Sequence, residues 1–400
     1  MSLTTRISVY RGPAPARSSQ DSPVIAFPVF DLKRILVNFM RYGRPAVIAI
    51  AAALVLSSCA SNEAGSTATD DAAASTLSGT INAAGASSQG SAQEAWISAF
   101  QTANPDVTIN YDPSGSGAGR ETFIAGGTDF AGSDSYLNDE ELAGAFAACV
   151  PDTTAVDLPV YISPIAVIFN VEGVTDLNLD ADTLAKIFTG AITTWNDPAI
   201  VALNADAKLP ATAITAVHRS DDSGTTKNFA DYLFQAAPDV WTEKPADPFP
   251  YATGEGAQGT SGVVDAVTNG TGTIGYADAS RAGDLGVAKI KVGEEFVEYT
   301  AEAAAAVVDG SPLVEGRADN DLAVKLDRLT TDATHYPLVL VSYALVCTEY
   351  ADAEQGALVK EYVGYMASEE GQAEAAASAG AAPLSADLQS KVAAVLETVK

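Results

Sequence analysis

From residue 77 to the C-terminus, short apolar segments typical of β-strands alternate with segments of helical periodicity. Apolar residues spaced i, i+3, i+4, i+7 predict helices at 184–191 and 229–236, and Trp96 with Phe100 gives one turn of another. This alternation indicates an α/β fold with mostly parallel sheets. The predicted strands are residues 107–111, 158–170, 213–217, 273–276 and 338–346.

Length and charge narrow the class of protein. The chain has 400 residues, enough for about two domains once a processed leader is removed. Asp and Glu outnumber Lys and Arg by 51 to 22, and the net charge of -29 argues against a nucleic-acid partner and against adhesion to anionic lipid. The two histidines, His218 and His335, lie far apart, so we expect no multi-histidine metal centre and no cofactor.

The N-terminal region has the pattern of an export signal. Arg41 and Arg44 precede the apolar run 45–56, which is shorter than the roughly 20 residues that span a bilayer as a helix. The run ends in Leu-Ser-Ser-Cys at Cys59, which resembles the bacterial lipoprotein box, in which the cysteine is lipidated. The alternative is an ordinary signal peptide with an incidental cysteine.

We assign residues 1–59 to this leader, and we expect that 1–39 come from a misassigned start, because Met40 would begin a signal of ordinary length. Residues 60–76 are small and polar and predict a flexible linker. The other two cysteines, Cys149 and Cys347, could form a disulfide in an exported protein. Two buried free thiols are the alternative for this pair.

Four segments are rich in Ser, Gly or Asp: residues 85–89, 114–119, 129–134 and 218–226. The first follows a short predicted strand at 80–82, and the second and fourth follow the predicted strands 107–111 and 213–217. Taken singly, such a segment is most often a turn with a helix N-cap residue. Three of them place hydroxyls and backbone N–H groups at a helix start, where unpaired donors and the helix dipole favour an anion. The fourth adds Arg219, whose planar guanidinium suits a tetrahedral oxyanion. Together they predict a binding site for a small oxyanion.

These motifs resemble the phosphate-binding proteins of bacterial ABC-type phosphate importers, the PstS family. The resemblance is carried by Gly-Ser-Gly-Ala-Gly at 115–119, Thr-Asp-Phe-Ala-Gly-Ser-Asp at 128–134 and Arg-Ser-Asp-Asp-Ser-Gly-Thr at 219–225. It extends to residues 187–197 and 272–276, and covers roughly residue 77 to the C-terminus. It implies a periplasmic-binding-protein-like fold, with two α/β lobes joined by hinge strands and one phosphate enclosed in the cleft. On that reading, lobe I is 77–164 plus 335–400 and lobe II is 165–334.

The resemblance also implies a role for each site residue. Asp134 would accept the proton of a protonated phosphate, and Arg219, oriented by Asp221, would pair with the anion. The family often has an aromatic residue where this chain has Ser88, so the shielding of that side of the site departs from the family pattern. The remaining phosphate contacts would come from Ser87, the Ser88 N–H, Ser116, Ser223, the Gly224 N–H and Thr225.

The expected function is therefore that of a monomeric, lipid-anchored, extracytoplasmic receptor that delivers inorganic phosphate to an ABC permease without covalent chemistry. A receptor for another oxyanion, such as sulfate or molybdate, is an alternative, although a carboxylate at Asp134 favours a ligand that carries a proton. A secreted phosphatase is a further alternative, and would need an activated nucleophile or a pair of metal ions.

Overall fold

The computed structural model describes residues 75–400, in which nine strands form one large mixed sheet. Eight strands follow the order β2-β1-β3-β12-β4-β8-β6-β7, and β9 pairs with β4. The strands are β1 (Gly79–Gly85), β2 (Val107–Asp112), β3 (Phe130–Ser133), β4 (Ala155–Asn170), β6 (Thr215–Arg219), β7 (Glu255–Ala257), β8 (Thr273–Asp278), β9 (Gly286–Val287) and β12 (Val339–Cys347). A second sheet contains β5 (Asn178–Leu179), β10 (Lys289–Val292) and β11 (Glu295–Val297).

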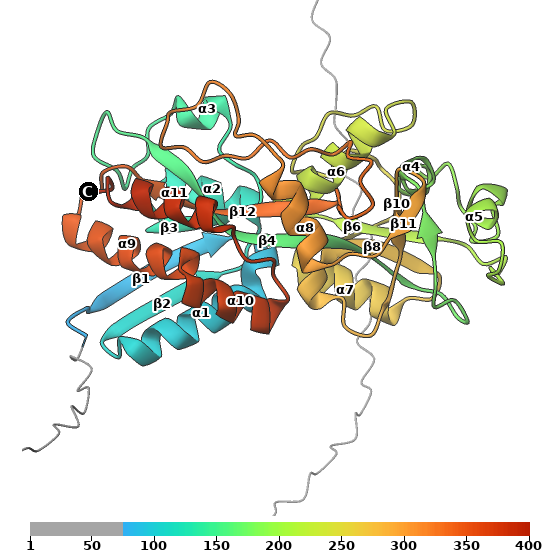
Figure 1. The fold of residues 1–400 in the computed structure, drawn as a ribbon, viewed down its shortest axis with the longest axis horizontal. Coiled ribbons are helices and arrows are strands. Elements are labelled where there is room, and N and C mark those ends of the chain that lie inside the picture. The colour runs from blue at the N-terminus through green and yellow to red at the C-terminus, as the bar shows by residue number, and fades with distance from the viewer. Residues whose placement is uncertain (1–74) are drawn as a thin grey trace, which may run out of the picture. The chain divides into compact units, whose positions relative to one another are not determined.

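Helices gather around the two ends of the large sheet (Figure 1). We call β1–β3 with their helices the first half, and β6–β8 with theirs the second half. The first half includes α1 (Gly90–Ala103), α2 (Ser116–Ile124), α3 (Asp139–Leu142), α9 (Ala353–Ala367), α10 (Glu369–Ala379) and α11 (Ala386–Leu396). The second half includes α4 (Ala181–Phe188), α5 (Pro198–Leu203), α6 (Gly224–Ala236), α7 (Gly259–Asn269) and α8 (Ala301–Asp309). Two short 3-10 helices complete the fold, η1 (Ser87–Gln89) and η2 (Ala279–Arg281).

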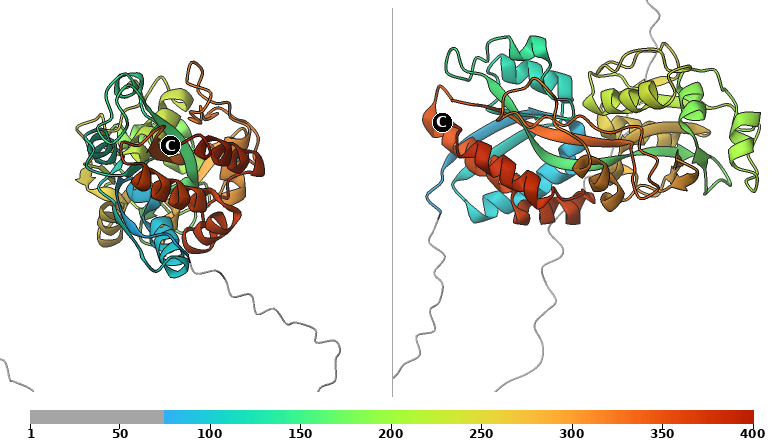
Figure 2. Two further views of the ribbon diagram at one scale, coloured as in Figure 1. Left: turned by 90° about the vertical axis from the view of Figure 1, so that its left-hand side faces the viewer. Right: turned by 45° about the horizontal axis from the view of Figure 1, so that its top comes forward.

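The long strand β4 connects the two halves. It pairs with β12 from Ala155 to Pro164, and with β8 from Ile165 onward. Its side chains are buried along almost its whole length, as are those of β12, which explains why both strands read as continuous apolar runs. Figures 1 and 2 show β4 and β12 running side by side between the two groups of helices.

The predicted α/β class is confirmed, whereas three local predictions need correction. The sheet is mixed, because β4 and β12 run antiparallel to each other and to their outer neighbours, and the parallel pairs lie towards the sheet's two ends. Residues 129–134 are not a loop, because Phe130–Ser133 form the buried strand β3. The helix predicted to reach Ala191 ends at Phe188, because Gly190 has a positive φ of 78° that breaks the helix.

A disulfide joins Cys149 to Cys347, with the two Cα atoms 5.4 Å apart. The sequence had left open whether these two cysteines are bonded to each other. The disulfide links the end of β12 to the segment before β4, across 198 residues of chain. Cys59, the predicted lipidation site, and the linker up to residue 74 lie outside the described residues.

Within residues 75–400, no helix is both long and apolar enough to span a membrane. The same part of the chain contains no group of three or more His, Cys, Asp or Glu side chains placed to hold a metal ion.

Candidate functional site

The site centres on the carboxylate of Asp134, which follows β3 directly and is 4% exposed. Its Oδ1 accepts hydrogen bonds of 2.6 Å from the hydroxyls of Ser88 and Ser342. Its Oδ2 accepts one of 2.8 Å from the hydroxyl of Thr225, in the first turn of α6. One carboxylate therefore collects hydroxyls from η1, β12 and α6, which come from both halves of the molecule.

Burial raises the pKa of Asp134, and the hydrogen bonds from Ser342, Ser88 and Thr225 oppose that rise by stabilising the charged form. The positive charge of Arg219 opposes it as well. Oδ1 accepts two side-chain hydrogen bonds and Oδ2 accepts one, so Oδ2 can accept a further hydrogen-bond donor.

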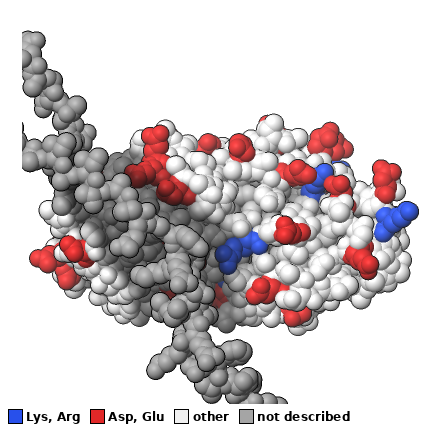
Figure 3. Space-filling view, turned by 90° about the horizontal axis from the view of Figure 1, so that it is seen from below, with Lys and Arg blue, Asp and Glu red and all other residues white. Residues whose placement is uncertain are grey.

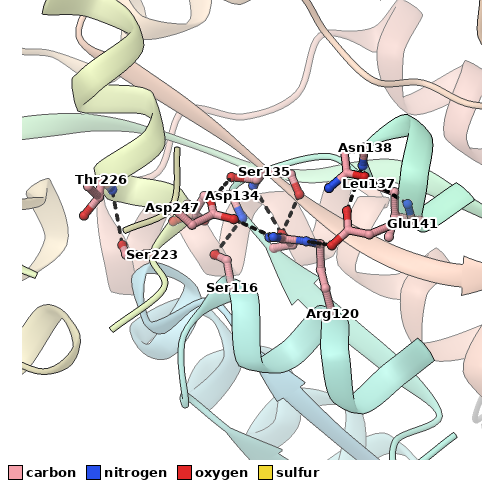
Figure 4. A network of polar contacts seen from close by, with 12 residues as sticks. Ser116, Arg120, Asp134, Ser135, Leu137, Asn138, Glu141, Ser223, Thr226 and Asp247 are labelled. Atoms are coloured by element: carbon pink, nitrogen blue, oxygen red, sulfur yellow. Dashed lines mark hydrogen bonds and ion pairs between the residues drawn. The ribbon is translucent and has the colours of Figure 1, made fainter. Parts of the chain in front are cut away.

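Two helix N-termini meet beside Asp134. Ser116 begins α2, and its hydroxyl accepts a 3.1 Å hydrogen bond from the backbone N–H of Asp134 (Figure 4). Gly224 begins α6 behind its N-cap Ser223, whose hydroxyl accepts from the N–H of Thr226. A Cβ on Gly224 would lie 2.7 Å from the Cβ of Asp134 and 2.8 Å from the Ser116 hydroxyl, so this close approach requires glycine. The positive ends of both helix dipoles point at one place, which favours an anion there.

Arg219 ends β6 and is 3% exposed. Its guanidinium makes a bidentate salt bridge with Asp221, in which Nε donates to Oδ1 at 2.7 Å and Nη2 donates to Oδ2. Oδ1 of Asp221 also accepts from the backbone N–H of Gly259, at the start of α7. Burial alone would raise the pKa of Asp221, but the hydrogen bond and the charge of Arg219 outweigh it and lower the pKa. The ion pair with Asp221 thus holds Arg219 in one orientation, and the positive charge of Arg219 opposes the rise in the pKa of Asp134.

The first predicted loop contributes in a way the sequence did not indicate. The Ser87 hydroxyl lies 3.0 Å from the Thr260 hydroxyl and accepts a 3.1 Å hydrogen bond from the Thr260 N–H, which joins η1 to α7. For Ser88 the prediction used the backbone N–H, whereas the structure shows its hydroxyl donating to Asp134. The structure therefore brings Ser88, Ser116 and Thr225 into hydrogen-bond contact with Asp134, and it places Gly224 against Asp134 and Ser116.

Sequence reasoning missed Ser342, which lies in β12 and is fully buried. Besides donating to Asp134, the Ser342 hydroxyl accepts a 2.7 Å hydrogen bond from Nε2 of Gln89. A signal was present, because Ser342 is a polar residue within an otherwise apolar, fully buried strand.

A family model described as a PBP superfamily domain matches residues 70–370. Among curated proteins, the chain is 38% identical over 335 residues to "Phosphate-binding protein PstS 3" of Mycobacterium tuberculosis, covering 81% of this chain and 90% of that protein. It is 34% identical over 375 residues to "Phosphate-binding protein PstS 2" of the same species, covering 91% and 100% of the two chains.

Solved structures show the same fold. A high-affinity periplasmic phosphate-binding protein, PfluDING, bound with phosphate, aligns with a TM-score of 0.63 and 22% identity, covering 79% of this chain and 93% of that one. A phosphate ABC transporter substrate-binding protein from Clostridium perfringens, described as putative and with bound phosphate, aligns with a TM-score of 0.54 and 20% identity, covering 76% and 100%. At these identities, the likeness shows the fold alone.

Proposed function

We propose that this chain, which belongs to the PstS family of phosphate-binding proteins, captures inorganic phosphate outside the cytoplasm and delivers it to an ABC-type import permease. The observation that carries the proposal is the buried Asp134 carboxylate between two helix N-termini, together with the buried guanidinium of Arg219 that Asp221 holds at the end of β6. The relatives named above are binding proteins, so we assign the chain a transport role and no covalent step.

The proposed ligand contacts follow from the site. The N–H groups and hydroxyls at the starts of α2 and α6 would donate to phosphate oxygens, and Arg219 would balance the negative charge. Asp221 acts behind Arg219 and fixes its direction. The full set proposed to hold phosphate is Ser87, Ser88, Ser116, Asp134, Arg219, Ser223, Gly224 and Thr225.

Asp134 also gives the site a reason to prefer phosphate to sulfate. Phosphate near neutral pH carries at least one proton and can donate to the carboxylate, whereas sulfate carries none and would place its lone pairs against those of Asp134. An unmatched buried polar group costs about 1–3 kcal/mol, and a charged one more. Since about 1.4 kcal/mol corresponds to a tenfold change in affinity, this contact supports discrimination of an order of magnitude or more.

The acidic surface does not prevent anion capture. On the face shown in Figure 3, acidic patches outnumber basic ones, in keeping with the net charge of -29. Salt screens exposed charges beyond about 8–10 Å, whereas the N–H groups and Arg219 would act on the ligand at contact distance in a dry site. The surface charge would affect the rate of encounter more than the affinity.

We also propose that the chain has two lobes, which close over the ligand. The two lobes, 77–164 plus 335–400 and 165–334, are supported by the change of partner of β4 from β12 to β8 at Pro164 and Ile165. Closure of two such lobes over one ligand is a known type of motion. We further propose that Cys59 carries a lipid anchor and that the protein acts as a monomer, on the basis of the Leu-Ser-Ser-Cys sequence and the family.

Calorimetric titration of the full chain with phosphate, sulfate and molybdate tests this function. We expect saturable binding of one phosphate per chain and much weaker binding of the other two anions. Tighter binding of sulfate or molybdate would identify a receptor for a different oxyanion. Release of a chromophore from a phosphoester by the purified chain would instead point to a phosphatase.

A further inference from the structure

Arg120, in α2 of the first half, forms an ion pair with Asp247, which lies between α6 and β7 of the second half (Figure 4). Nη2 of Arg120 lies 2.5 Å from Oδ2 of Asp247, and Oδ1 of the same carboxylate accepts a 2.8 Å hydrogen bond from the Ser135 hydroxyl. Asp247 is therefore held by two side chains of the opposite half. Neither Arg120 nor Asp247 belongs to the proposed phosphate contacts.

The pair is shielded from water. The side chains of Arg120 and Asp247 are 7% and 12% exposed. Burial alone would raise the pKa of Asp247, but the positive charges of Arg120 and Lys227 outweigh it and hold the pKa below its usual value. The carboxylate is therefore charged at neutral pH, and its attraction to Arg120 is screened far less than that of an exposed pair.

Arg120 has other partners within its own half. Nε contacts Glu141 of α3 at 2.8 Å, and Nη1 donates to the Ser133 hydroxyl at 3.2 Å. If the two halves separated, Arg120 would keep these two contacts and would lose Asp247. The Arg120–Asp247 pair therefore forms when the two halves are closed and is lost when they are open. A contact that exists in only one of two states raises the population of that state, here the closed one.

The backbone of Asp247 also contacts the start of α6. The carbonyl oxygen of Asp247 accepts a 3.1 Å hydrogen bond from the backbone N–H of Ser223, the residue that caps α6. Holding Asp247 against the first half therefore also holds Ser223 and the start of α6 beside Asp134 and Ser116.

We propose that Arg120 and Asp247 form a latch between the two halves, which slows the release of phosphate without contacting it. Both are positioning residues: Asp247 acts through Ser223, and Arg120 acts through Asp247. The inference rests on the proposed function, because it assumes that phosphate is held between the two halves. It predicts an effect mainly on the dissociation rate, since the pair forms only once the halves have closed.

The test is the release rate of radiolabelled phosphate from the full chain after a chase with excess unlabelled phosphate. We expect Asp247→Asn to raise this rate by about 10- to 100-fold, because it removes one charge of a buried pair. The ratio of phosphate to sulfate affinity should stay at the wild-type value, because Asp134 is untouched. A release rate within about twofold of wild type, or a loss of selectivity equal to that of an Asp134 variant, would overturn the latch.

Two control experiments test whether the faster release comes from the loss of the Arg120–Asp247 pair itself. Asp387→Asn makes the same chemical change in the exposed pair that Asp387 forms with Lys391 within α11, and should leave the release rate unchanged. Arg120→Gln alone should speed release, and the variant carrying both Arg120→Gln and Asp247→Asn should release no faster than the faster single variant. If the two effects multiply, the residues act separately and the latch is wrong.

The failure of the latch can be told from the failure of the proposed function. A wild-type chain that binds no phosphate would contradict the function. A wild-type chain that binds phosphate, together with an unchanged release rate in Asp247→Asn and in Arg120→Gln, would contradict the latch alone.

Discussion

The carboxylate of Asp134, directly after β3, accepts a 2.8 Å hydrogen bond from the hydroxyl of Thr225 in the first turn of α6, 91 residues further along the chain and in the other half of the molecule. Both residues belong to motifs that were identified separately in the sequence. Their contact places the proposed proton acceptor for the ligand directly beside a helix N-terminus. The site is therefore assembled from both halves and depends on how closely they approach.

Asp134→Asn should reduce the preference for phosphate over sulfate. The amide replaces a charged acceptor by a neutral group that can itself donate, so the penalty for an anion without a proton falls. We expect the ratio of the two dissociation constants, measured by calorimetry, to shift towards sulfate by about tenfold or more. Asp387→Asn, in an exposed ion pair within α11, serves as the control. An unchanged ratio would show that Asp134 does not select the ligand.

Gly224→Ala should weaken phosphate binding while leaving the fold intact. The added Cβ would lie 2.7 Å from the Cβ of Asp134, so the two halves could not approach as closely. Overpacking of this kind costs about 1–3 kcal/mol, or roughly 5- to 150-fold in affinity. Gly364→Ala in α9 is the matched control, because its nearest neighbour, Leu396, lies 3.7 Å from the added atom. Equal dissociation constants for the two variants would contradict the close approach at Gly224.

Asp221→Asn should weaken phosphate binding through Arg219. The substitution removes the negative partner of the Arg219 guanidinium, which then loses its fixed direction. The amide oxygen of Asn can still accept the hydrogen bond from the Gly259 N–H, so the start of α7 keeps its contact with residue 221. We expect the dissociation constant to rise by about tenfold, with the selectivity against sulfate unchanged. Loss of selectivity without loss of affinity would be inconsistent with a role behind Arg219.

The stability of the protein should fall as the pH rises through the titration of Asp278. Burial raises the pKa of this carboxyl to about 6, from an ordinary value of 3.8. The folded chain therefore binds more protons than the unfolded chain between these values, and the free energy of unfolding decreases as the pH rises from about 4 to about 6.

Asp278→Asn removes this titration and keeps an acceptor for the Tyr161 hydroxyl, which donates to Oδ1 at 3.1 Å. We expect the variant to be more stable than wild type above pH 7, by about 2–3 kcal/mol, and the difference to shrink towards pH 4. Urea unfolding at several pH values measures it. A constant difference between pH 4 and pH 8 would show that Asp278 does not titrate as described.

Replacing both Cys149 and Cys347 by Ala should destabilise the chain by about 2–4 kcal/mol, because the bridge restricts a long loop in the unfolded state. The midpoint of urea unfolding should fall accordingly, and reduction of the wild-type protein should lower it to a similar value. A variant as stable as the oxidised wild type would show that the bridge adds nothing to the fold.

The sequence indicated the segments of the proposed site because their chemistry is local. Hydroxyls and glycines at the start of a helix favour an anion wherever the helix lies, and the family resemblance then implied individual residues such as Ser116, Ser223 and Gly224. Ser342 was missed because its role depends on the neighbouring strand: β12 runs antiparallel to β3, and this pairing brings the Ser342 hydroxyl to Asp134. No short-range pattern encodes that approach.

By itself, the sequence determined that the chain alternates strands and helices, that it contains four Ser-, Gly- or Asp-rich segments, and that Arg219 lies in one of them. Periodicity and capping are properties of neighbouring residues, so they can be read without a structure. Only the tertiary structure decided that β4 carries the chain from one half to the other, that Cys149 reaches Cys347, and that Arg120 pairs with Asp247. These contacts join residues far apart in the chain, and their formation depends on how all the intervening elements pack.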